Sequence, residues 1–139
     1  AIVLQACGHN PTGLDFTPSQ WETIASIMIE RKLIPVLDMA YLGLVTGCIE
    51  TDSYSARLFH SLEIEVLICI SYSKNMGLYN ERVGLLGWYA STKHTSDQIK
   101  DRLCYIIRNS YSNPPAHGAK IVSKILNDPK LMEEWYSYY

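Results

Sequence analysis

One lysine near the middle of the chain has neighbours that suit covalent chemistry. Lys74 closely follows the run of residues 65–70, with Ser71 and Ser73 before it and Arg82 after it. A lysine that loses its ammonium proton can form a Schiff base with a carbonyl group, and nearby positive charge or burial promotes that loss. Hydroxyls and a planar guanidinium also suit a phosphate. The segment therefore predicts an anchor for an aldehyde cofactor that carries a phosphate.

The run before Lys74 predicts where this amine lies in the fold. Residues 65–70 (EVLICI) are short and mostly apolar, which is typical of a strand buried on both faces. Such a strand brings Lys74 to its carboxyl end, where ligands bind in open α/β sheets. Most lysines are solvated surface charges. The strand, the two serines and the arginine together favour the functional interpretation here.

Strand and helix patterns alternate along the rest of the chain. This alternation predicts a three-layer α/β/α fold with a mostly parallel sheet. The last strand follows Lys74 by only a short loop, so we expect one antiparallel strand. Pro35 cannot donate to a sheet ladder and should lie near a strand start or at an unpaired position. The predicted strands cover residues 2–6, 33–37, 65–70 and 83–89, and the predicted helices cover residues 54–62, 96–108 and a segment starting at residue 17.

The start of that first helix carries local signals. Thr17, Pro18 and Gln20 predict a cap, a first-turn proline and a capping box. Apolar side chains then recur at helical spacing, and we interpret them as a stripe that faces the core. The stripe consists of Trp21, Ile24, Ala25, Met28 and Ile29.

Composition excludes several classes of partner. A chain of 139 residues buries one domain core. A formal net charge of -2 and a pI near 6.1 give no support for nucleic acid or an anionic membrane, so a small molecule is the expected partner. No apolar stretch reaches the ~20 residues that span a bilayer. The chain is therefore expected to be soluble.

The cysteines and histidines give no sign of a metal or a disulfide framework. Cys7, Cys48, Cys69 and Cys104 are widely spread without a CxxC pair. We interpret them as reduced core residues of an intracellular protein. No spacing of histidine, cysteine or carboxylate residues indicates a metal site.

Four motifs occur in order along nearly the whole chain: HNPTG at residues 9–13, DMAY at 38–41, SYSKNMGLYNERVG at 71–84 and RNSYSNPP at 108–115. In this order and at these separations they resemble the class I pyridoxal-phosphate-dependent aminotransferases, in the aspartate aminotransferase branch. The resemblance implies pyridoxal 5'-phosphate as the cofactor, a homodimer as the assembly, and amino acids and 2-oxo acids as substrates.

The resemblance also implies a role for each polar residue. Lys74 would hold the cofactor as a Schiff base and then move the proton at the substrate Cα as general acid and base. Asp38 would pair with the pyridine nitrogen, so that the ring can take up electrons. Tyr41 and Asn10 would hydrogen-bond the phenolic oxygen of the ring, and Asn10 would also contact the substrate carboxylate. The implied catalytic residues are Lys74, Asp38 and Tyr41, and the implied cofactor-binding residues are Asn10, Asp38, Tyr41, Ser71, Ser73, Lys74 and Arg82.

Without the resemblance, the residues outside the segment around Lys74 have simpler interpretations. Asp38 would be a cap or turn residue, Tyr41 a core aromatic and Asn10 a turn former. Arg108 would be a solvated charge near a helix end. In the resembled branch, the arginine that matches Arg108 comes from the partner subunit and binds the side-chain carboxylate of the substrate.

Arg108 therefore points to aspartate aminotransferase, which reversibly transfers an amino group between L-aspartate and 2-oxoglutarate to give oxaloacetate and L-glutamate. Three alternatives stay open. Aromatic or broad-range aminotransferases of the same branch keep such an arginine, a cyclopropane-forming synthase belongs to the same fold type, and a truncated chain could be a non-catalytic module.

We expect the chain to be an internal piece of a longer protein, because it opens inside a strand without methionine and stops in a helix without a cap. Residues 1–127 would form part of the large, cofactor-binding domain, and residues 128–139 would begin the helix that leads to a small domain. The remaining site residues would lie outside this chain, so the piece alone would be inactive. The expected compartment is the cytoplasm, with mitochondria or another organelle open because a transit peptide would precede residue 1.

Overall fold

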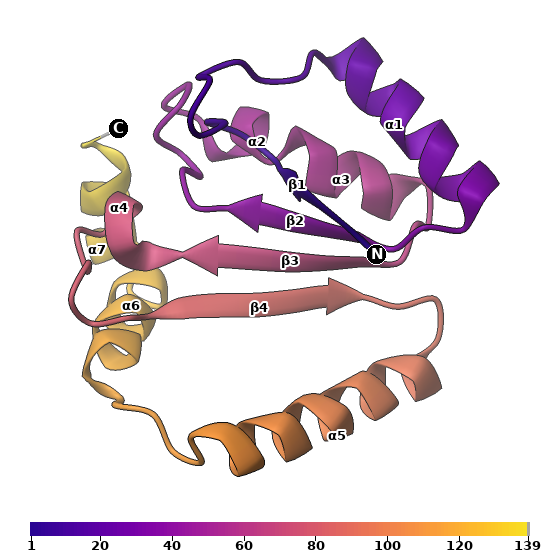
Figure 1. Ribbon diagram of the computed structural model, residues 1–139. Helices are drawn as coiled ribbons and strands as arrows, with labels where there is room; N and C mark the ends of the chain where they lie inside the picture. Colours follow the sequence, from indigo (N-terminus) through magenta and orange to yellow (C-terminus); the bar gives the residue numbers. More distant parts are fainter. Residues whose placement is uncertain (139) are drawn as a thin grey trace.

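In the computed structural model, which describes residues 1–138, four strands form one mixed sheet in the order β1-β2-β3-β4 (Figure 1). The three parallel strands pair β1 with β2 and β2 with β3, and the fourth strand runs antiparallel to β3. The predicted α/β fold with one antiparallel strand is confirmed. Tyr139, the last residue of the predicted segment 128–139, lies outside the described residues. The strands are β1 (Ile2–Gln5), β2 (Pro35–Met39), β3 (Val66–Ser71) and β4 (Gly84–Tyr89).

Helices connect and follow the strands. The structure confirms the helices predicted from residue 17, over 54–62 and over 96–108, and α7 begins where a final helix was expected. It adds α2 and α4, which are single turns too short to show a period, and α6, whose N-cap position is Ala116 without a side-chain cap bond. The helices are α1 (Pro18–Arg31), α2 (Ile49–Asp52), α3 (Tyr54–Ser61), α4 (Tyr72–Asn75), α5 (Lys93–Ser110), α6 (His117–Leu126) and α7 (Pro129–Tyr136).

The first helix begins as its sequence predicts. Thr17 Oγ1 accepts a hydrogen bond from the Gln20 amide at 3.3 Å, and Gln20 Oε1 accepts one from the Thr17 amide at 2.8 Å. Pro18 occupies the first turn, where its missing N–H costs nothing. Two orphan backbone donors are thereby satisfied, so the start of α1 is set by local chemistry.

The second strand lies two residues later than predicted. The amides of Lys32 and Leu33 donate to carbonyls in the last turn of α1, so these residues close the helix and do not enter the sheet. Pro35 is the first residue of β2, as expected for a residue that cannot donate to the ladder. Asp38 consequently lies inside β2, one residue before its end.

The core lies between α1, α3 and one face of the sheet. Phe59 of α3 is fully buried and meets Trp21 of α1 edge to face, with ring centroids 5.9 Å apart. Leu37 and Met39 of β2 are buried in the same cluster. Within the predicted α1 stripe, Trp21, Ala25 and Met28 are buried and Ile24 packs against the cluster. The prediction is wrong for Ile29, which is 56% exposed. Ile29 lies at the edge of the apolar stripe, on a part of the helix surface that does not face the core.

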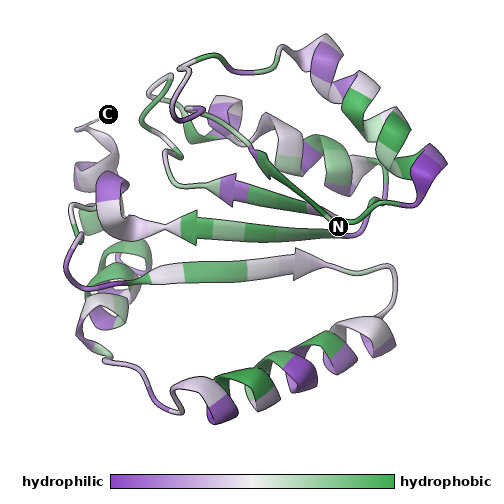
Figure 2. Ribbon diagram, in the orientation of Figure 1, coloured by the Kyte–Doolittle hydropathy of each residue, from purple (hydrophilic) through white to green (hydrophobic). Residues whose placement is uncertain are grey.

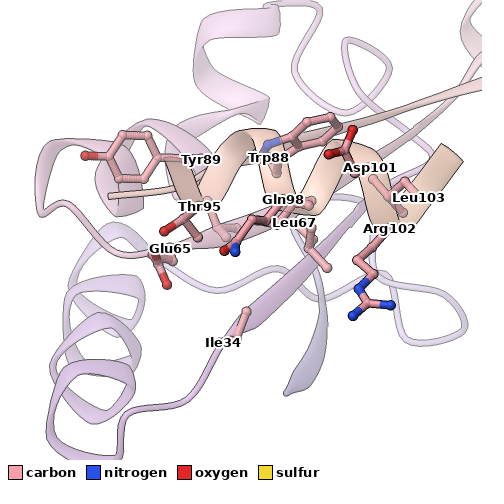
Figure 3. Close-up of a pocket in the computed structure, with 12 residues that line it drawn as sticks. Ile34, Glu65, Leu67, Trp88, Tyr89, Thr95, Gln98, Asp101, Arg102 and Leu103 are labelled. Carbon is pink, nitrogen blue, oxygen red and sulfur yellow. The ribbon is translucent and has the colours of Figure 1, made fainter. Parts of the chain in front are cut away.

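The opposite side of the sheet is loosely covered. All residues of α5 are described, and none of them is buried. Figure 2 shows that α5 carries apolar as well as strongly polar residues. A cavity of about 680 Å³ separates α5 from the sheet, lined by Ile34, Leu67 and Trp88 on one side and Gln98 and Arg102 on the other (Figure 3). This side therefore contributes little to the core.

The four cysteines are free thiols with different surroundings. Cys7 is buried and Cys69 half-buried, in line with the predicted core positions. The prediction is wrong for Cys48, which lies in the exposed turn before α2, and for Cys104, which lies on the unburied helix α5. Among residues 1–138, no helix has the length and apolar character needed to cross a membrane.

Candidate functional site

The carboxylate of Asp38 belongs to the sheet face that the core leaves open. Its neighbours in β2, Leu37 and Met39, are buried in the core, and side chains alternate along a strand. In register, Asp38 lies between Gln5 of β1 and Cys69 of β3. Burial, and next the charge of Asp38, raise the pKa of the Cys69 thiol. The carboxylate therefore lies close to the strand that leads to Lys74.

Lys74 and Tyr41 meet just beyond the carboxyl ends of β2 and β3. Lys74 Nζ lies over the Tyr41 ring, 4.6 Å from its centroid, and both side chains are half-buried. This is within the range of a cation–π contact. Lys74 belongs to the single turn α4, which follows β3 directly. The lysine thus lies where the sequence predicts, in a helical turn that the sequence does not indicate.

Two of the predicted phosphate ligands share that turn. Ser71 Oγ accepts a hydrogen bond from the Ser73 amide at 3.2 Å and caps α4. The Ser73 side chain is buried, with 7% of its surface exposed. Arg82 lies farther on, in the exposed loop before β4, and its Nη1 donates to the Tyr79 carbonyl at 3.0 Å. The structure therefore groups Ser71 and Ser73 with Lys74, while Arg82 bonds within its own loop.

Asn10 is exposed on the loop after β1, and side chains hold the backbone of this loop. The amide of Asn10 donates to Gln5 Oε1 at 2.6 Å. The Asp15 carboxylate accepts from the amides of Gly8 and His9, at 2.8 and 2.9 Å. Side chains before and after this stretch, Gln5 and Asp15, thus bind three consecutive backbone amides and hold the segment that presents Asn10.

This loop touches the loop that carries Tyr41. Gly8 has a positive φ of 65°, and a Cβ added there would lie 2.8 Å from Tyr41 Cβ. Only glycine fits this close approach without strain. Gly8 therefore places the Asn10 loop against the residue beneath Lys74. The glycine at this position is the sequence signal for this close contact with Tyr41. We did not predict the contact from the sequence.

A buried carboxylate holds the loop after Tyr41. Asp52, with 4% of its surface exposed, accepts hydrogen bonds from the Gly43 amide at 2.8 Å, the Val45 amide at 3.2 Å and Thr46 Oγ1 at 2.8 Å. A buried polar group is tolerated when it is hydrogen-bonded in this way. Sequence reasoning also missed Asp52, because its partners are defined only by the folded loop.

The charges of carboxylates on three segments act on the Cys7 thiol. Burial, followed by the charges of Asp52, Asp15 and Asp38, raises the pKa of the Cys7 thiol to about 12. Because a thiol is nucleophilic only as the thiolate, the raised pKa disfavours Cys7 as a nucleophile at neutral pH. The amine of Lys74 is the chemically distinctive group at this end of the sheet.

Arg108 lies apart from the other predicted residues. It is exposed in the last turn of α5, on the far side of β4 from α1 and α3 (Figure 1). The structure therefore does not group it with Lys74, Tyr41 and Asp38. The cavity beside α5 is likewise lined by residues other than these three, because it forms where α5 stands off the sheet.

Comparisons with known proteins show which family the chain resembles. The chain is 46% identical over 134 residues to the mitochondrial aspartate aminotransferase P2 of Lupinus angustifolius, and 42% identical over 134 residues to a cytoplasmic aspartate aminotransferase of Schizosaccharomyces pombe. These alignments cover 96% of this chain and 30% and 33% of the two relatives.

A solved structure shares the same architecture. The aromatic-amino-acid aminotransferase of Burkholderia pseudomallei, covalently bound to pyridoxal phosphate, matches with a TM-score of 0.94 at 40% identity, over 98% of this chain and 34% of that protein. The chain therefore spans about a third of the length of the proteins it matches. A family model described as aminotransferase class I and II matches residues 1–138. On this evidence, the chain belongs to the class I and II aminotransferase family.

Proposed function

We propose that the intact protein is a pyridoxal-phosphate-dependent aminotransferase and that Lys74 attaches the cofactor. The observation that carries the proposal is the placement of Lys74 Nζ over the Tyr41 ring, at the end of the sheet where Asp38 lies. Family membership supports the reaction class, and the cofactor bound to the Burkholderia pseudomallei relative supports the choice of cofactor.

The residues present fit such a cofactor. Its aldehyde needs an amine, its pyridine nitrogen a carboxylate, and its phosphate hydroxyl and guanidinium donors. Asp38 lies near the end of β2, and Lys74 lies in the turn α4 directly after the neighbouring parallel strand β3. Ser73 belongs to the same turn, and Ser71 caps it. Ser71 Oγ accepts in the cap of α4, so its hydroxyl proton remains available for an anion. Arg82 uses one Nη1 N–H for the Tyr79 carbonyl, and the guanidinium has further N–H donors that would serve the phosphate.

When bound, pyridoxal phosphate supplies a ring that takes up electrons from the substrate Cα. Lys74 Nζ would move the proton between that Cα and the cofactor carbon as general acid and base. Asp38 would keep the pyridine nitrogen protonated, and Tyr41 and Asn10 would donate to the phenolic oxygen. Catalysis is therefore divided between a base on α4 and a fixed charge on β2.

For the substrate, we propose L-aspartate with 2-oxoglutarate. Arg108 of one protomer would bind the side-chain carboxylate in the site of the other, which requires a homodimer and explains why Arg108 stands apart from Lys74 within one chain. An aromatic amino acid is the second candidate, because the Burkholderia pseudomallei relative is an aromatic-amino-acid aminotransferase. We also propose that residues 1–127 belong to the large domain, that residues 128–139 begin the connection to a small domain, and that the protein acts in the cytoplasm.

Attachment at Lys74 is tested by reduction with borohydride in the presence of pyridoxal phosphate, followed by peptide mass mapping of the intact protein. We expect the label on Lys74. Lys74→Ala should lose the label and lower kcat at least 10²- to 10⁴-fold, the range for loss of a general base. Label on another lysine would overturn the proposal.

Substrate choice is tested by steady-state transamination of aspartate against phenylalanine, each with 2-oxoglutarate. Arg108→Lys keeps the charge but loses the bidentate fork. It should lower kcat/KM for aspartate about 10- to 100-fold, and that for phenylalanine much less. Equal losses for both substrates would contradict a side-chain carboxylate site at Arg108.

A further inference from the structure

The turn that carries Lys74 is too short to hold itself in place. The α4 helix comprises Tyr72–Asn75, a single turn. A single turn fixes several backbone dihedrals for few hydrogen bonds, so it depends on outside contacts for its position. The contacts that hold α4 therefore determine where the Lys74 amine is presented.

One such contact is made by the residue after the lysine. Asn75 is 8% exposed, and its Nδ2 donates to the Leu42 carbonyl at 3.3 Å. Leu42 is buried and follows Tyr41 directly. Lys74 and Tyr41 meet in the cation–π contact. The residues that directly follow them, Asn75 and Leu42, form this buried hydrogen bond. This bond ties α4 to the loop after β2.

A second contact ties the same residue to the C-terminal helix. Trp135 of α7 donates from Nε1 to the Asn75 carbonyl at 3.0 Å, across 60 residues of sequence. The indole is half-buried. Asn75 therefore joins three segments through its side chain and its carbonyl: α4, the Tyr41 loop and α7. Losing a buried bond of this kind leaves a polar group unsatisfied, so the turn should shift.

We propose that Asn75 is a positioning residue that keeps the Lys74 amine in register with Tyr41, and that Trp135 supports it from α7. The inference rests on the proposed role of Lys74 as the cofactor lysine and as the base at the substrate Cα. It adds a residue that touches neither substrate nor cofactor and acts through the geometry of α4. Displacing a reacting group by about 1 Å can cost 10²-fold in rate.

The test compares Asn75→Ala with Asn127→Ala in the intact protein loaded with pyridoxal phosphate. Asn127 is a matched control, because it is exposed and its side-chain amide donates only to Ser123 of α6, the helix that Asn127 follows, in the bonds described. With aspartate deuterated at Cα, Asn75→Ala should lower kcat roughly 10- to 100-fold, raise the isotope effect on kcat and change KM less than about twofold. A purely structural defect would lower the active fraction and leave the isotope effect unchanged.

A second readout does not depend on turnover. The apo protein is mixed with pyridoxal phosphate, and borohydride-trapped label on Lys74 is followed over time by peptide mass. Labelling should be about tenfold slower in Asn75→Ala than in Asn127→Ala, as expected for loss of one buried hydrogen bond. Absence of label on Lys74 in the unmodified protein would overturn the proposed function. Equal labelling rates and isotope effects in both variants would overturn the role of Asn75 alone.

Trp135→Phe keeps the test decisive if Asn75→Ala does not fold. It removes only the indole N–H and retains most of the aromatic contact. We expect an isotope effect raised in the same direction as for Asn75→Ala, with a smaller loss in kcat. An unchanged isotope effect in a folded Trp135→Phe protein, together with unfolded Asn75→Ala, would overturn the proposal.

Discussion

The two faces of the sheet differ in how completely they are covered. On one face, α1 and α3 bury Phe59, Leu37 and Met39 in a continuous cluster. On the other, all of α5 is described and none of its residues is buried, and a cavity separates it from the sheet. The segments that carry Asn10, Tyr41 and Lys74 follow or end strands β1, β2 and β3, whose other face packs against α1 and α3. The difference shows that the core of this chain supports the end of the sheet where Lys74 lies. Arg108 lies on α5, which does not pack into that core.

The largest expected effect comes from removing a core side chain. Phe59→Ala should lower the free energy of unfolding of the 139-residue chain by about 3–5 kcal/mol, because Phe59 is fully buried against Trp21. Ile106→Ala on α5 should change it by less than about 0.5 kcal/mol, because Ile106 is 56% exposed. Urea unfolding followed by circular dichroism measures both. A similar loss in the two variants would mean that α5 packs as tightly as α3.

An intermediate effect comes from removing the same cap on each side. Thr17 and Thr92 both accept a hydrogen bond from the amide three residues later. Thr17→Ala should cost about 1 kcal/mol of global stability, because α1 is part of the core. Thr92→Ala should instead speed amide hydrogen exchange in the first turn of α5 and leave exchange in the sheet unchanged. Faster exchange across the sheet in Thr92→Ala would show that α5 unfolds together with the core.

The smallest expected effect concerns a bond that connects the two sides. Glu65, just before β3, accepts hydrogen bonds from the Ser91 amide at 3.0 Å and from Ser91 Oγ at 2.8 Å, next to the start of α5. These bonds hold the pKa of the Glu65 carboxyl below its usual value. A lowered pKa stabilises the fold above the unfolded-state value near 4.5, and this contribution disappears as the pH falls through the folded-state value.

Glu65→Gln should therefore reduce the loss of unfolding free energy between neutral and acid pH, by no more than about 0.5 kcal/mol. The effect is small because solvent largely screens this carboxylate. Urea midpoints between pH 3 and 6, compared with Glu63→Gln as an exposed control, measure the difference. Identical profiles for Glu65→Gln and the unchanged chain would show that the bond contributes nothing.

The sequence predicted the elements whose signals are local. The capping box at Thr17 and Gln20, the antiparallel β4 and the position of Pro35 depend on neighbouring residues or loop length, and all three are confirmed. Helix α6 lacks a side-chain cap at Ala116, so its start had no signal. The exposure of Cys104 was missed because the pattern of a helix shows which residues share a face, and does not show whether anything covers that face.

For the candidate site, the surroundings of Lys74 in the sequence were enough to single out the lysine, whereas Asp38, Tyr41 and Asn10 were singled out by the resemblance of four motifs to the aminotransferase family. Their geometry was decided by contacts between distant segments. Gly8 lies against Tyr41, Asp52 holds the loop after β2, and the Leu42 carbonyl accepts from Asn75 across 33 residues of sequence. Local patterns record which groups are available, whereas close packing between segments selects which of them meet. That is why the sequence alone names the lysine, and only the folded chain shows what holds it in place.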